Sequence, residues 1–361
     1  MLPSDSTTQH VETSEVDFSQ YLEAKPSHLF PNQKLFFRHQ WFTNGIADLN
    51  SIKAIVVVVH GYGEYASFLT IQKLAGFFNQ QDVAVYSFDL RLFNKFISVN
   101  TQTGLMKLVD PDLVTFDEVV QDVQIALENV FACFPPVQYP NLKVLLCGYS
   151  IGATISMMFL CKIYNGLPDK RLVGFIFCAP FFHIFADKEC EESNSWTTYL
   201  MKQALYWLPN YAIFNFDVNT VKQNFSTDDS YLEMLENDPK IRENCRSTLP
   251  SHACMLPSCN GRFANSCLSL LEALNEAITH PKQTFETKNR RKLKILLMHG
   301  EKDAFFPSSQ SEKWFNSMNQ YHECYLQKYP DLKHYLLYDS GNDQVFTDLS
   351  FFLNKVTQCS K

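Results

Sequence analysis

The sequence predicts an α/β protein in which helices cover both faces of a mostly parallel sheet. Two observations carry this prediction. Short segments rich in β-branched residues alternate along the chain with longer segments of helical character. Most of the short segments are almost continuously apolar, which is typical of strands buried on both faces. Alternation of such strands with helices indicates a parallel sheet between two helical layers.

The predicted strands are short, and most of them end abruptly at a glycine, alanine-proline, aspartate or histidine-glycine. The clearest reads AIVVVV over Ala54–Val59 and is followed by His60-Gly61. A first strand is expected over Leu35–Trp41, and the others are Val83–Phe88, Lys143–Cys147, Val173–Cys178, Leu293–Met298 and Tyr325–Lys328. In such sheets ligands bind beyond the carboxyl ends of the strands. The residues that follow each strand are therefore the first to inspect.

The segments between these strands have helical character. Helices are expected over Phe68–Gln80, Phe116–Phe131, Gly152–Tyr164, Ser308–Asn319 and Asp343–Val356.

Residues 183–290 interrupt the alternation, because they contain no β-branched strand. They hold two segments of helical character, Trp196–Leu208 and Cys267–Ile278, with a loop-like, cysteine-rich stretch over Cys245–Cys267. We expect residues 183–290 to form a helical cap inserted into a core of residues 35–182 and 291–361. Residues 1–34 are polar and without periodicity, so most of them are expected to form a flexible N-terminal tail.

Composition excludes several classes of protein. The chain has 361 residues, 46% of them hydrophobic, and a formal net charge of −7. It is too apolar for a disordered chain, and its acidic balance argues against a nucleic-acid-binding face. No apolar run approaches the roughly 18 residues of a membrane span. Several of the eleven cysteines lie inside apolar segments, and the N-terminus has no secretory signal; both favour a reducing, cytoplasmic location.

The segment Gly148-Tyr149-Ser150-Ile151-Gly152 has the pattern G-x-S-x-G between a predicted strand and a predicted helix. In that context the pattern indicates a nucleophile elbow, a strained turn that pushes a serine hydroxyl out of the sheet. The positions two residues away must then lack side chains, as Gly148 and Gly152 do. The following helix offers backbone N–H groups to an oxyanion.

A second glycine-containing turn, His60-Gly61-Tyr62-Gly63-Glu64, follows the strand Ala54–Val59. Glycines there let the backbone approach a substrate oxygen closely. We expect the N–H groups of Tyr62 and Ile151 to form an oxyanion hole, with Gly61 and Gly63 shaping the loop. A plain tight turn is the alternative. His60 is expected to hold this loop rather than to act as a base.

A serine hydroxyl needs a base within hydrogen-bond reach, and the base needs an orienting carboxylate. In this architecture the carboxylate and the histidine follow the serine in that order. Asp303 lies just past the strand Leu293–Met298, and the nearby Glu301 is expected to face water. Of the two later histidines, His322 precedes the last strand and lies at the wrong end of the sheet. His334 follows that strand and is the expected base.

These motifs together resemble the serine hydrolases that include monoacylglycerol lipases, lysophospholipases and the proline-type serine aminopeptidases of the α/β-hydrolase fold. The resemblance runs from about Leu35 to the C-terminus and includes LFFRHQW and the stretch from Leu208-Pro209-Asn210 to Glu236-Asn237-Asp238-Pro239. It implies a nucleophile at Ser150, an acid at Asp303 and a base at His334, with oxyanion donors at Tyr62 and Ile151.

One loop departs from the family pattern. After its next strand the family usually has D-x-x-G-x-G-x-S, whereas this chain has Asp89-Leu90-Arg91-Leu92-Phe93-Asn94-Lys95-Phe96, without either glycine. We expect this loop to follow another path and to change the shape of the pocket. The cap is also expected to be longer than usual, through Cys245–Cys267.

Three weaker signals lie in the expected cap. A zinc set could come from His252, Cys254, Cys259 and Cys267, although their spacing matches no standard zinc motif. An acidic turn contains Glu189, Glu191 and Glu192; it could hold a substrate amine, as an aminopeptidase requires, but a solvated surface turn is the expected interpretation. An apolar stripe at near-helical spacing contains Tyr199, Leu200, Ala204, Leu205, Trp207 and Leu208. The stripe could pack on the core, touch lipid or line an acyl tunnel.

The function expected from these residues is hydrolysis of carboxylic esters of lipids with one acyl chain, monoacylglycerol first and lysophospholipid second. No cofactor, metal or nucleic-acid partner is expected. Transient contact of the cap with a membrane surface is expected. Two alternatives remain open: a proline-type serine aminopeptidase of the same fold, and a non-catalytic ligand-binding or scaffold protein.

Overall fold

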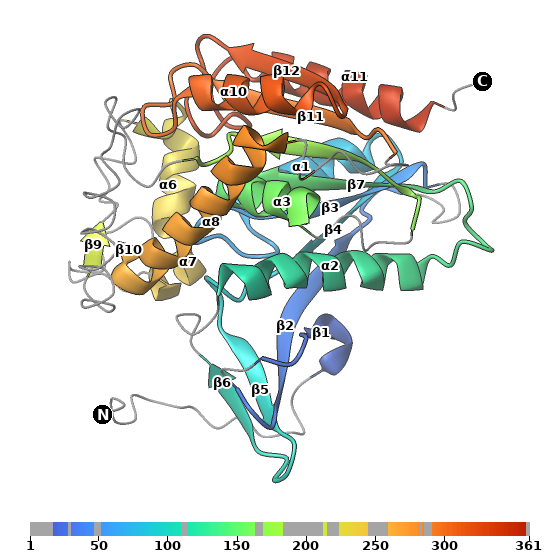
Figure 1. The fold of residues 1–361 in the computed structure, drawn as a ribbon, viewed down its shortest axis with the longest axis vertical. Coiled ribbons are helices and arrows are strands. Elements are labelled where there is room, and N and C mark those ends of the chain that lie inside the picture. Colours follow the sequence, from blue (N-terminus) through green and yellow to red (C-terminus); the bar gives the residue numbers. More distant parts are fainter. Residues whose placement is uncertain are drawn as a thin grey trace.

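The computed structural model describes residues 17–27, 30–46, 52–109, 115–162, 169–182, 212–214, 224–244, 259–281, 284 and 291–358. Ten strands of this part of the chain form one mixed sheet (Figure 1). They are β1 (Tyr21–Glu23), β2 (Gln33–Phe42), β3 (Ala54–Val59), β4 (Val83–Phe88), β5 (Phe96–Asn100), β6 (Met106–Val109), β7 (Lys143–Tyr149), β8 (Leu172–Cys178), β11 (Lys294–Gly300) and β12 (Glu323–Tyr329). The strand order is β12-β11-β8-β7-β3-β4-β2-β5-β6, with β1 beside β2.

The strands from β4 to β12 in this order are parallel, which confirms the predicted sheet. β3 pairs with β4 on one side and with β7 on the other. β7 then pairs with β8, β8 with β11, and β11 with β12. Their carboxyl ends therefore meet at one edge of the sheet, where the site is expected.

The other part of the sheet is antiparallel and is formed by β1, β2, β5 and β6. The long strand β2 joins the two parts, because Gln33–Phe36 pairs with β5 and His39–Phe42 pairs with β4. In Figure 1 these strands extend below the parallel sheet. Strand β1 lies within residues expected to belong to a tail, and β5 and β6 follow the unusual loop after β4.

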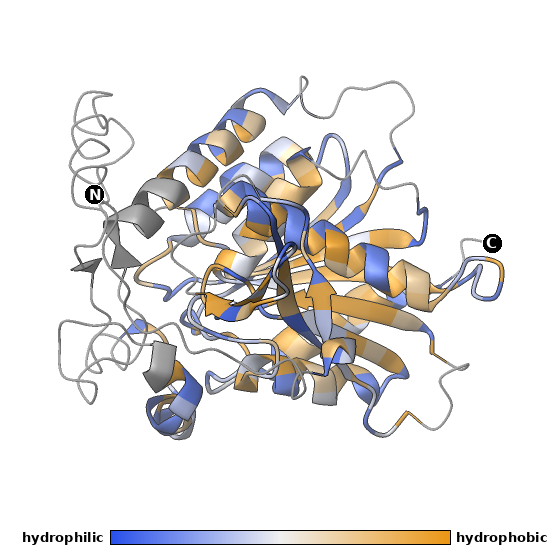
Figure 2. Ribbon diagram, turned by 90° about the horizontal axis from the view of Figure 1, so that it is seen from below, coloured by the Kyte–Doolittle hydropathy of each residue, from blue (hydrophilic) through white to orange (hydrophobic). Residues whose placement is uncertain are grey.

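Two hydrophobic cores lie on opposite faces of the sheet, and β3 contributes to both. Ile55, Val57 and Val59 belong to one core, and Ala54, Val56 and Val58 to the other. The strands at the centre of the molecule are accordingly coloured mainly as hydrophobic in Figure 2. A strand buried on both faces has no polar side to alternate, which explains the continuous apolar sequence.

Helices α2 (Phe116–Cys133), α3 (Ile151–Lys162), α8 (Gly261–Thr279) and α10 (Ser308–Met318) contribute to the first core, and α1 (Leu69–Asn79) and α11 (Asp343–Thr357) to the second. Helix α2 begins with a capping box, in which Thr115 and Glu118 bind each other's backbone N–H groups. Helix α3 packs against β7 on one side and against α2 and α8 on others, and nearly all of it is buried.

Only part of the expected cap is described. It contains β9 (Ala212–Phe214), which pairs with β10 (Cys259–Asn260), and the helices α6 (Asp229–Asn237), α7 (Pro239–Asn244) and α8. Helix α8 begins at Gly261, inside the stretch expected to be a cysteine-rich loop. Its buried residues Cys267, Leu270 and Leu274 join the first core, so this helix packs on the body of the fold. The helix expected over Trp196–Leu208 lies outside the described residues. Among the described helices, none combines the length and hydropathy needed to cross a bilayer.

Candidate active site

Three strand ends bring together the residues that the sequence separates. Ser150 lies between β7 and α3, Asp303 follows β11, and His334 follows β12. Because β11 and β12 are parallel neighbours, with Gly300 opposite Tyr329, the two loops that follow them leave the sheet side by side. All three side chains are nearly buried, with exposed fractions of 8% for Ser150, 6% for Asp303 and 2% for His334.

The imidazole of His334 connects the other two side chains. Its Nδ1 lies 2.7 Å from Asp303 Oδ2, and its Nε2 lies 2.9 Å from Ser150 Oγ. An ionised carboxylate can only accept a hydrogen bond, so Nδ1 carries the proton. Nε2 is then free to accept the hydrogen of the Ser150 hydroxyl. This is the arrangement in which a histidine can remove a proton from serine.

The backbone at Ser150 is held in the left-handed region, with φ at +52°. Its N–H donates to Cys178 O at 2.8 Å, which ties the turn to the end of β8. A Cβ added to Gly148 would lie 2.4 Å from Ala153 Cα, and one added to Gly152 would lie 2.2 Å from Val59 O. Both positions therefore require glycine, and the strain of the turn, about 1–3 kcal/mol, is held by these close contacts.

Groups other than His334 also hold the Asp303 carboxylate. Its Oδ1 accepts the backbone N–H groups of Phe305 at 3.1 Å and Phe306 at 3.0 Å. Burial alone would raise the pKa of Asp303. The charge of His334 and hydrogen bonds from His299 and His334 outweigh it and hold the pKa well below its usual range. The carboxylate is thus ionised and fixed in orientation.

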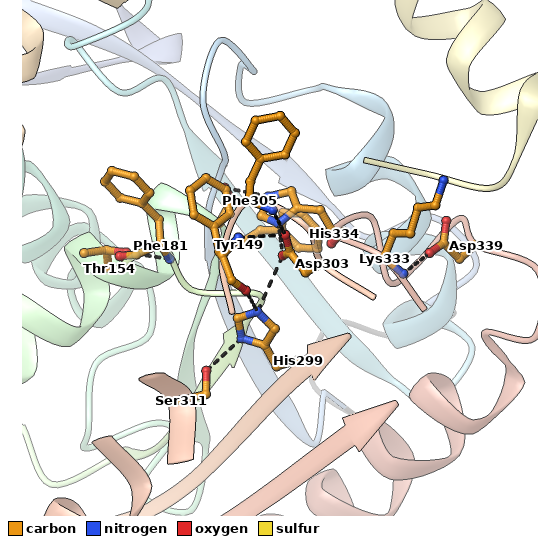
Figure 3. A network of polar contacts seen from close by, with 12 residues as sticks. Tyr149, Thr154, Phe181, His299, Asp303, Phe305, Ser311, Lys333, His334 and Asp339 are labelled. Atoms are coloured by element: carbon orange, nitrogen blue, oxygen red, sulfur yellow. Dashed lines mark hydrogen bonds and ion pairs between the residues drawn. The ribbon is translucent and has the colours of Figure 1, made fainter. Parts of the chain in front are cut away.

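His299 supports Asp303 from below, as Figure 3 shows. Its Nε2 lies 2.6 Å from Phe306 O and 3.5 Å from Asp303 Oδ2, and its Nδ1 lies 2.7 Å from Ser311 Oγ. Sequence reasoning did not single out this histidine. Its position at the end of β11, four residues before the acid, was the available signal.

The His334 loop approaches the acid loop closely because Gly300 has no side chain. A Cβ added there would lie 2.3 Å from both Leu332 O and Lys333 O. On the other side, the hydroxyl of Tyr149 donates to His334 O at 2.8 Å. Tyr149 occupies a variable position of G-x-S-x-G, so the motif itself carries no signal for this role.

The loop expected to provide an oxyanion donor forms a tight turn. Glu64 N donates to Gly61 O at 3.3 Å, and Gly63 has φ at +72°, as the third position of such a turn requires. Tyr62 is the second residue of this turn. Ile151 is the first residue of α3, and the close approach of Gly152 to Val59 O brings that helix end against the same loop.

A buried carboxylate closes the turn. Glu64 Oε2 accepts Gly61 N–H at 2.8 Å, and its Oε1 accepts the Thr70 hydroxyl at 3.0 Å. Burial raises the pKa of Glu64 to about 7, although both hydrogen bonds and the charge of His334 lower it. His60 is also buried, and burial lowers its pKa to about 4. Its Nε2 accepts Leu90 N–H at 2.9 Å, so His60 holds two loops together, as expected.

The loop after β4 is built from side chains where the family pattern has glycines. Asn94 Nδ2 donates to Glu64 O at 3.0 Å, and the ring of Phe93 packs edge-on to Tyr62 with centroids 4.9 Å apart. Arg91 is buried and makes two hydrogen bonds, of 2.8 Å and 2.7 Å, to Asp122 on α2. Asn94 and Phe93 therefore support the Gly61–Glu64 turn, and Arg91 anchors their loop to α2.

Aromatic rings surround the imidazole of His334. Phe225, Phe306, Tyr335 and Tyr149 have ring centroids 5.3, 5.1, 5.6 and 6.1 Å from it. Phe305 stacks on Phe225 at 4.7 Å. The base is thus nearly buried among aromatic rings.

The remaining expectations concern residues near and beyond the site. Glu301 is exposed, as expected, and pairs with Lys328. His322 Nδ1 accepts Leu293 N–H at 3.4 Å, which places it at the opposite end of the sheet, where β11 begins. The acidic turn and the apolar stripe lie outside the described residues. Of the four residues considered for zinc, only the buried Cys267 has a described side chain. No cluster of metal-ligating side chains occurs within the described part of the chain.

A parallel sheet between helical layers, with a serine on a strand–helix turn, defines the α/β-hydrolase class. The family model described as serine aminopeptidase, S33 (Hydrolase_4) matches residues 50–256, which is more than half of the chain. The chain belongs to this family. The match includes Ser150 but ends before Asp303 and His334, so those two assignments depend on the geometry above.

Solved structures of the same fold cover nearly the whole chain. A soluble variant of monoglyceride lipase from Saccharomyces cerevisiae, in complex with a substrate analogue, is 15% identical over 96% of this chain and 99% of its own, with a TM-score of 0.64. The monoacylglycerol lipase of Paleococcus ferrophilus is 14% identical over 88% and 98%, with a TM-score of 0.58. An esterase from Exiguobacterium antarcticum is 11% identical over 93% and 99%, with a TM-score of 0.54. At these identities the likeness shows the fold. No curated protein sequence matches the chain.

Proposed function

We propose that the protein is a serine hydrolase that cleaves carboxylic esters of lipids with one acyl chain. The observation that carries this proposal is the continuous contact from Asp303 through His334 to Ser150, with hydrogen-bond distances of 2.7 Å and 2.9 Å. We assign Ser150 as the nucleophile, His334 as the general base and Asp303 as the residue that orients the imidazole.

The reaction then has two stages. His334 Nε2 takes the proton of Ser150 Oγ, which attacks the ester carbonyl carbon and forms a tetrahedral oxyanion held by the N–H groups of Tyr62 and Ile151. The bond to the alcohol breaks, and His334 gives the alcohol its proton. Water, activated by His334, then attacks the acyl-enzyme and releases the carboxylic acid and free Ser150. Ester and water are consumed, and alcohol and acid are formed.

The surroundings of the base support an apolar acyl group as substrate. Phe225, Phe305 and Phe306 pack against one another or against His334, so an acyl chain would meet aromatic rather than charged groups. Monoacylglycerol is the first candidate and lysophospholipid the second. The monoglyceride lipases that share the fold are consistent with this order.

An aminopeptidase activity is the second candidate, because the family's own description names it. Such an enzyme needs a carboxylate that binds a substrate amine. The described carboxylates near the Gly61–Glu64 turn are already occupied: Glu64 binds Gly61 and Thr70, and Asp89 binds Ala66 N–H at 2.7 Å and approaches Lys240. Within the described residues this favours the ester substrate; the acidic turn with Glu189, Glu191 and Glu192 lies outside them.

The nucleophile is tested by Ser150→Ala, with Ser87→Ala as a control because Ser87 is also buried and donates to a backbone oxygen at 3.1 Å. Turnover of a 4-nitrophenyl acyl ester should fall on the order of 10⁶-fold in Ser150→Ala and change little in the control. Ester hydrolysis at the normal rate in Ser150→Ala would remove the assignment.

The substrate class is tested by comparing a 4-nitrophenyl acyl ester with an aminoacyl anilide. Preference for the anilide would remove the lipase proposal. Labelling of wild-type protein by a fluorophosphonate separates an enzyme from a scaffold, because a folded protein with an unlabelled Ser150 is a scaffold. Hydrolysis of a lipid mixture, followed by mass analysis of the products, then identifies the head group and chain length.

A further inference from the structure

The loop that carries His334 is hydrogen-bonded along its length to Phe225–Thr227, the segment that precedes α6. Tyr335 N donates to Phe225 O at 2.8 Å, and Lys333 Nζ donates to Ser226 O at 3.3 Å. Ser340 N donates to Thr227 Oγ1 at 3.1 Å. More than a hundred residues separate the two segments in the chain, so these contacts join the inserted region to the loop of the base.

The carboxylate of Asp339 is the centre of this contact. Asp339 is buried, with an exposed fraction of 1%. Its Oδ1 accepts Thr227 N–H at 2.7 Å and the Ser226 hydroxyl at 2.9 Å. Its Oδ2 accepts Lys333 N–H, the backbone group next to His334. One oxygen therefore binds the inserted segment and the other binds the loop of the base, a contact drawn in Figure 3.

The same segment also contacts the imidazole directly. The ring of Phe225 lies edge-on to His334 at 5.3 Å and stacks on Phe305 at 4.7 Å. Phe305 in turn follows Asp303 and donates its N–H to that carboxylate. A displacement of Phe225–Thr227 would therefore change both the backbone beside the base and the packing around its ring.

We propose that Asp339 is a positioning residue that couples His334 to the segment Phe225–Thr227, so that the base is correctly placed only when this segment is seated. The inference rests on the proposed function, because it assigns a role relative to the base. It goes beyond the roles of the three reacting side chains, because it states that the inserted region controls the geometry of the base through the buried carboxylate of Asp339.

The chemistry of the contact makes Asp339→Asn a sharp test. All three groups that face the carboxylate are donors. An asparagine keeps the shape but must turn its own N–H₂ group either toward Lys333 N–H or toward Thr227 and Ser226. On one side of the side chain, a hydrogen bond is then replaced by two N–H or O–H donors that face each other, while the hydrophobic surroundings stay the same.

We expect Asp339→Asn to lower kcat about 10- to 100-fold with less than about a 3-fold change in KM, because small displacements of a positioned group have effects of this size. The rate of fluorophosphonate labelling of Ser150 should fall by a similar factor. Asp348→Asn is the control: Asp348 lies on α11 and accepts from the Tyr329 hydroxyl and from Gln344 Nε2, both at 3.0 Å, rather than from the backbone beside His334. Its kcat and labelling rate should match the wild type.

Two further variants grade the effect. Ser226→Ala removes one of the two donors to Oδ1 and leaves the Lys333 contact, so kcat should fall only about 2- to 5-fold. Asp339→Glu keeps an acceptor for both sides and should recover part of the rate lost in Asp339→Asn. If Asp339→Asn does not fold, an unchanged kcat and labelling rate in Ser226→Ala would overturn the coupling.

Hydrogen exchange separates failure of this inference from failure of the proposed function. In Asp339→Asn, peptides that contain residues 226–228 and 332–335 should exchange their amide hydrogens about 10-fold faster or more, and those of α11 should not. Unchanged exchange in both peptides, or wild-type kcat in a folded Asp339→Asn protein, overturns the coupling. If the wild-type protein is not labelled by the fluorophosphonate but Asp339→Asn shows the predicted faster exchange, the hydrolase proposal fails. The coupling between Asp339 and Phe225–Thr227 then still stands.

Discussion

At the scale of single residues, Glu64 is a carboxylate whose charge is sensitive to pH near neutrality. It closes the Gly61–Glu64 turn, and burial raises its pKa from 4.5 to about 7. The folded chain therefore holds this proton more tightly than the unfolded chain does. The stabilisation is fully present below about pH 4.5 and is lost as the pH rises through 7.

We predict that Glu64→Gln removes this dependence. A glutamine still accepts from Gly61 N–H and carries no titrating charge. Relative to the wild type, its free energy of unfolding should rise by about 2–3 kcal/mol between pH 5 and pH 8. Urea unfolding at several pH values measures the difference. Stability curves of the two proteins that run parallel over this range would contradict the prediction.

The three side chains proposed to react could be predicted from the sequence, whereas their supporting residues could not. Ser150, Asp303 and His334 follow strand ends, and a parallel sheet places such positions at one edge. The roles of Tyr149 and Asp339 depend on hydrogen bonds to residues 185 and 113 positions away. No local sequence pattern indicates these two roles, because a tyrosine or an aspartate also occurs commonly in ordinary apolar or surface segments.

At the scale of elements, the position of the His334 loop depends on a glycine at the end of β11. The space for a Cβ at Gly300 is filled by the carbonyl oxygens of Leu332 and Lys333, each 2.3 Å away. A side chain there cannot be accommodated by a rotamer change, because backbone atoms occupy the space. The loop itself would have to move.

Gly300→Ala is therefore predicted to lower kcat about 100-fold through displacement of His334. Gly76→Ala is the control, since nothing lies within 4 Å of a Cβ at that position of α1. It should leave kcat unchanged and stabilise the helix by about 0.5–1 kcal/mol. Ester turnover and thermal unfolding of the two variants give the comparison, and equal kcat values would contradict the role of the glycine.

Elements with a strong local signal were predicted, and those defined by tertiary partners were not. Strands β3, β4, β7, β8 and β11 are largely apolar and appear where expected, within one or two residues at each end. Strand β1 has only three residues and is defined by its antiparallel pairing with β2. Helix α8 begins at Gly261, six residues before the expected start at Cys267, and sequence periodicity within Cys245–Cys267 did not indicate that extension.

At the scale of the whole molecule, a buried ion pair joins the loop after β4 to helix α2. Arg91 and Asp122 have side-chain exposures of 2% and 0%. Burial raises the pKa of Asp122 to about 6, against the opposing effect of the Arg91 charge. Arg91 lies just before Leu92 and Asn94, the two positions where the family pattern has glycines, and the pair anchors this loop to helix α2.

Removal of one partner is predicted to destabilise the whole fold. Arg91→Met leaves the buried Asp122 carboxyl without its partner and should lower the free energy of unfolding by about 3–5 kcal/mol, and Asp122→Leu in the same chain should restore much of the loss. Lys34→Met, which breaks an exposed pair with Glu23, should cost less than about 1 kcal/mol. Urea titrations measure all three, and a loss no larger in Arg91→Met than in Lys34→Met would argue against the role of the pair.

The pairing of β8 with β11 has a consequence for biosynthesis. These neighbours in the sheet end and begin at Cys178 and Lys294, so β8 remains an open edge while the ribosome makes everything between them. An unpaired apolar edge strand is a template for aggregation, and closure of so long a loop slows folding. The newly made chain therefore has a prolonged interval in which that edge is open to aggregation. A truncated product that ends before β11 would keep the hydroxyl of Ser150 and would accumulate as insoluble material.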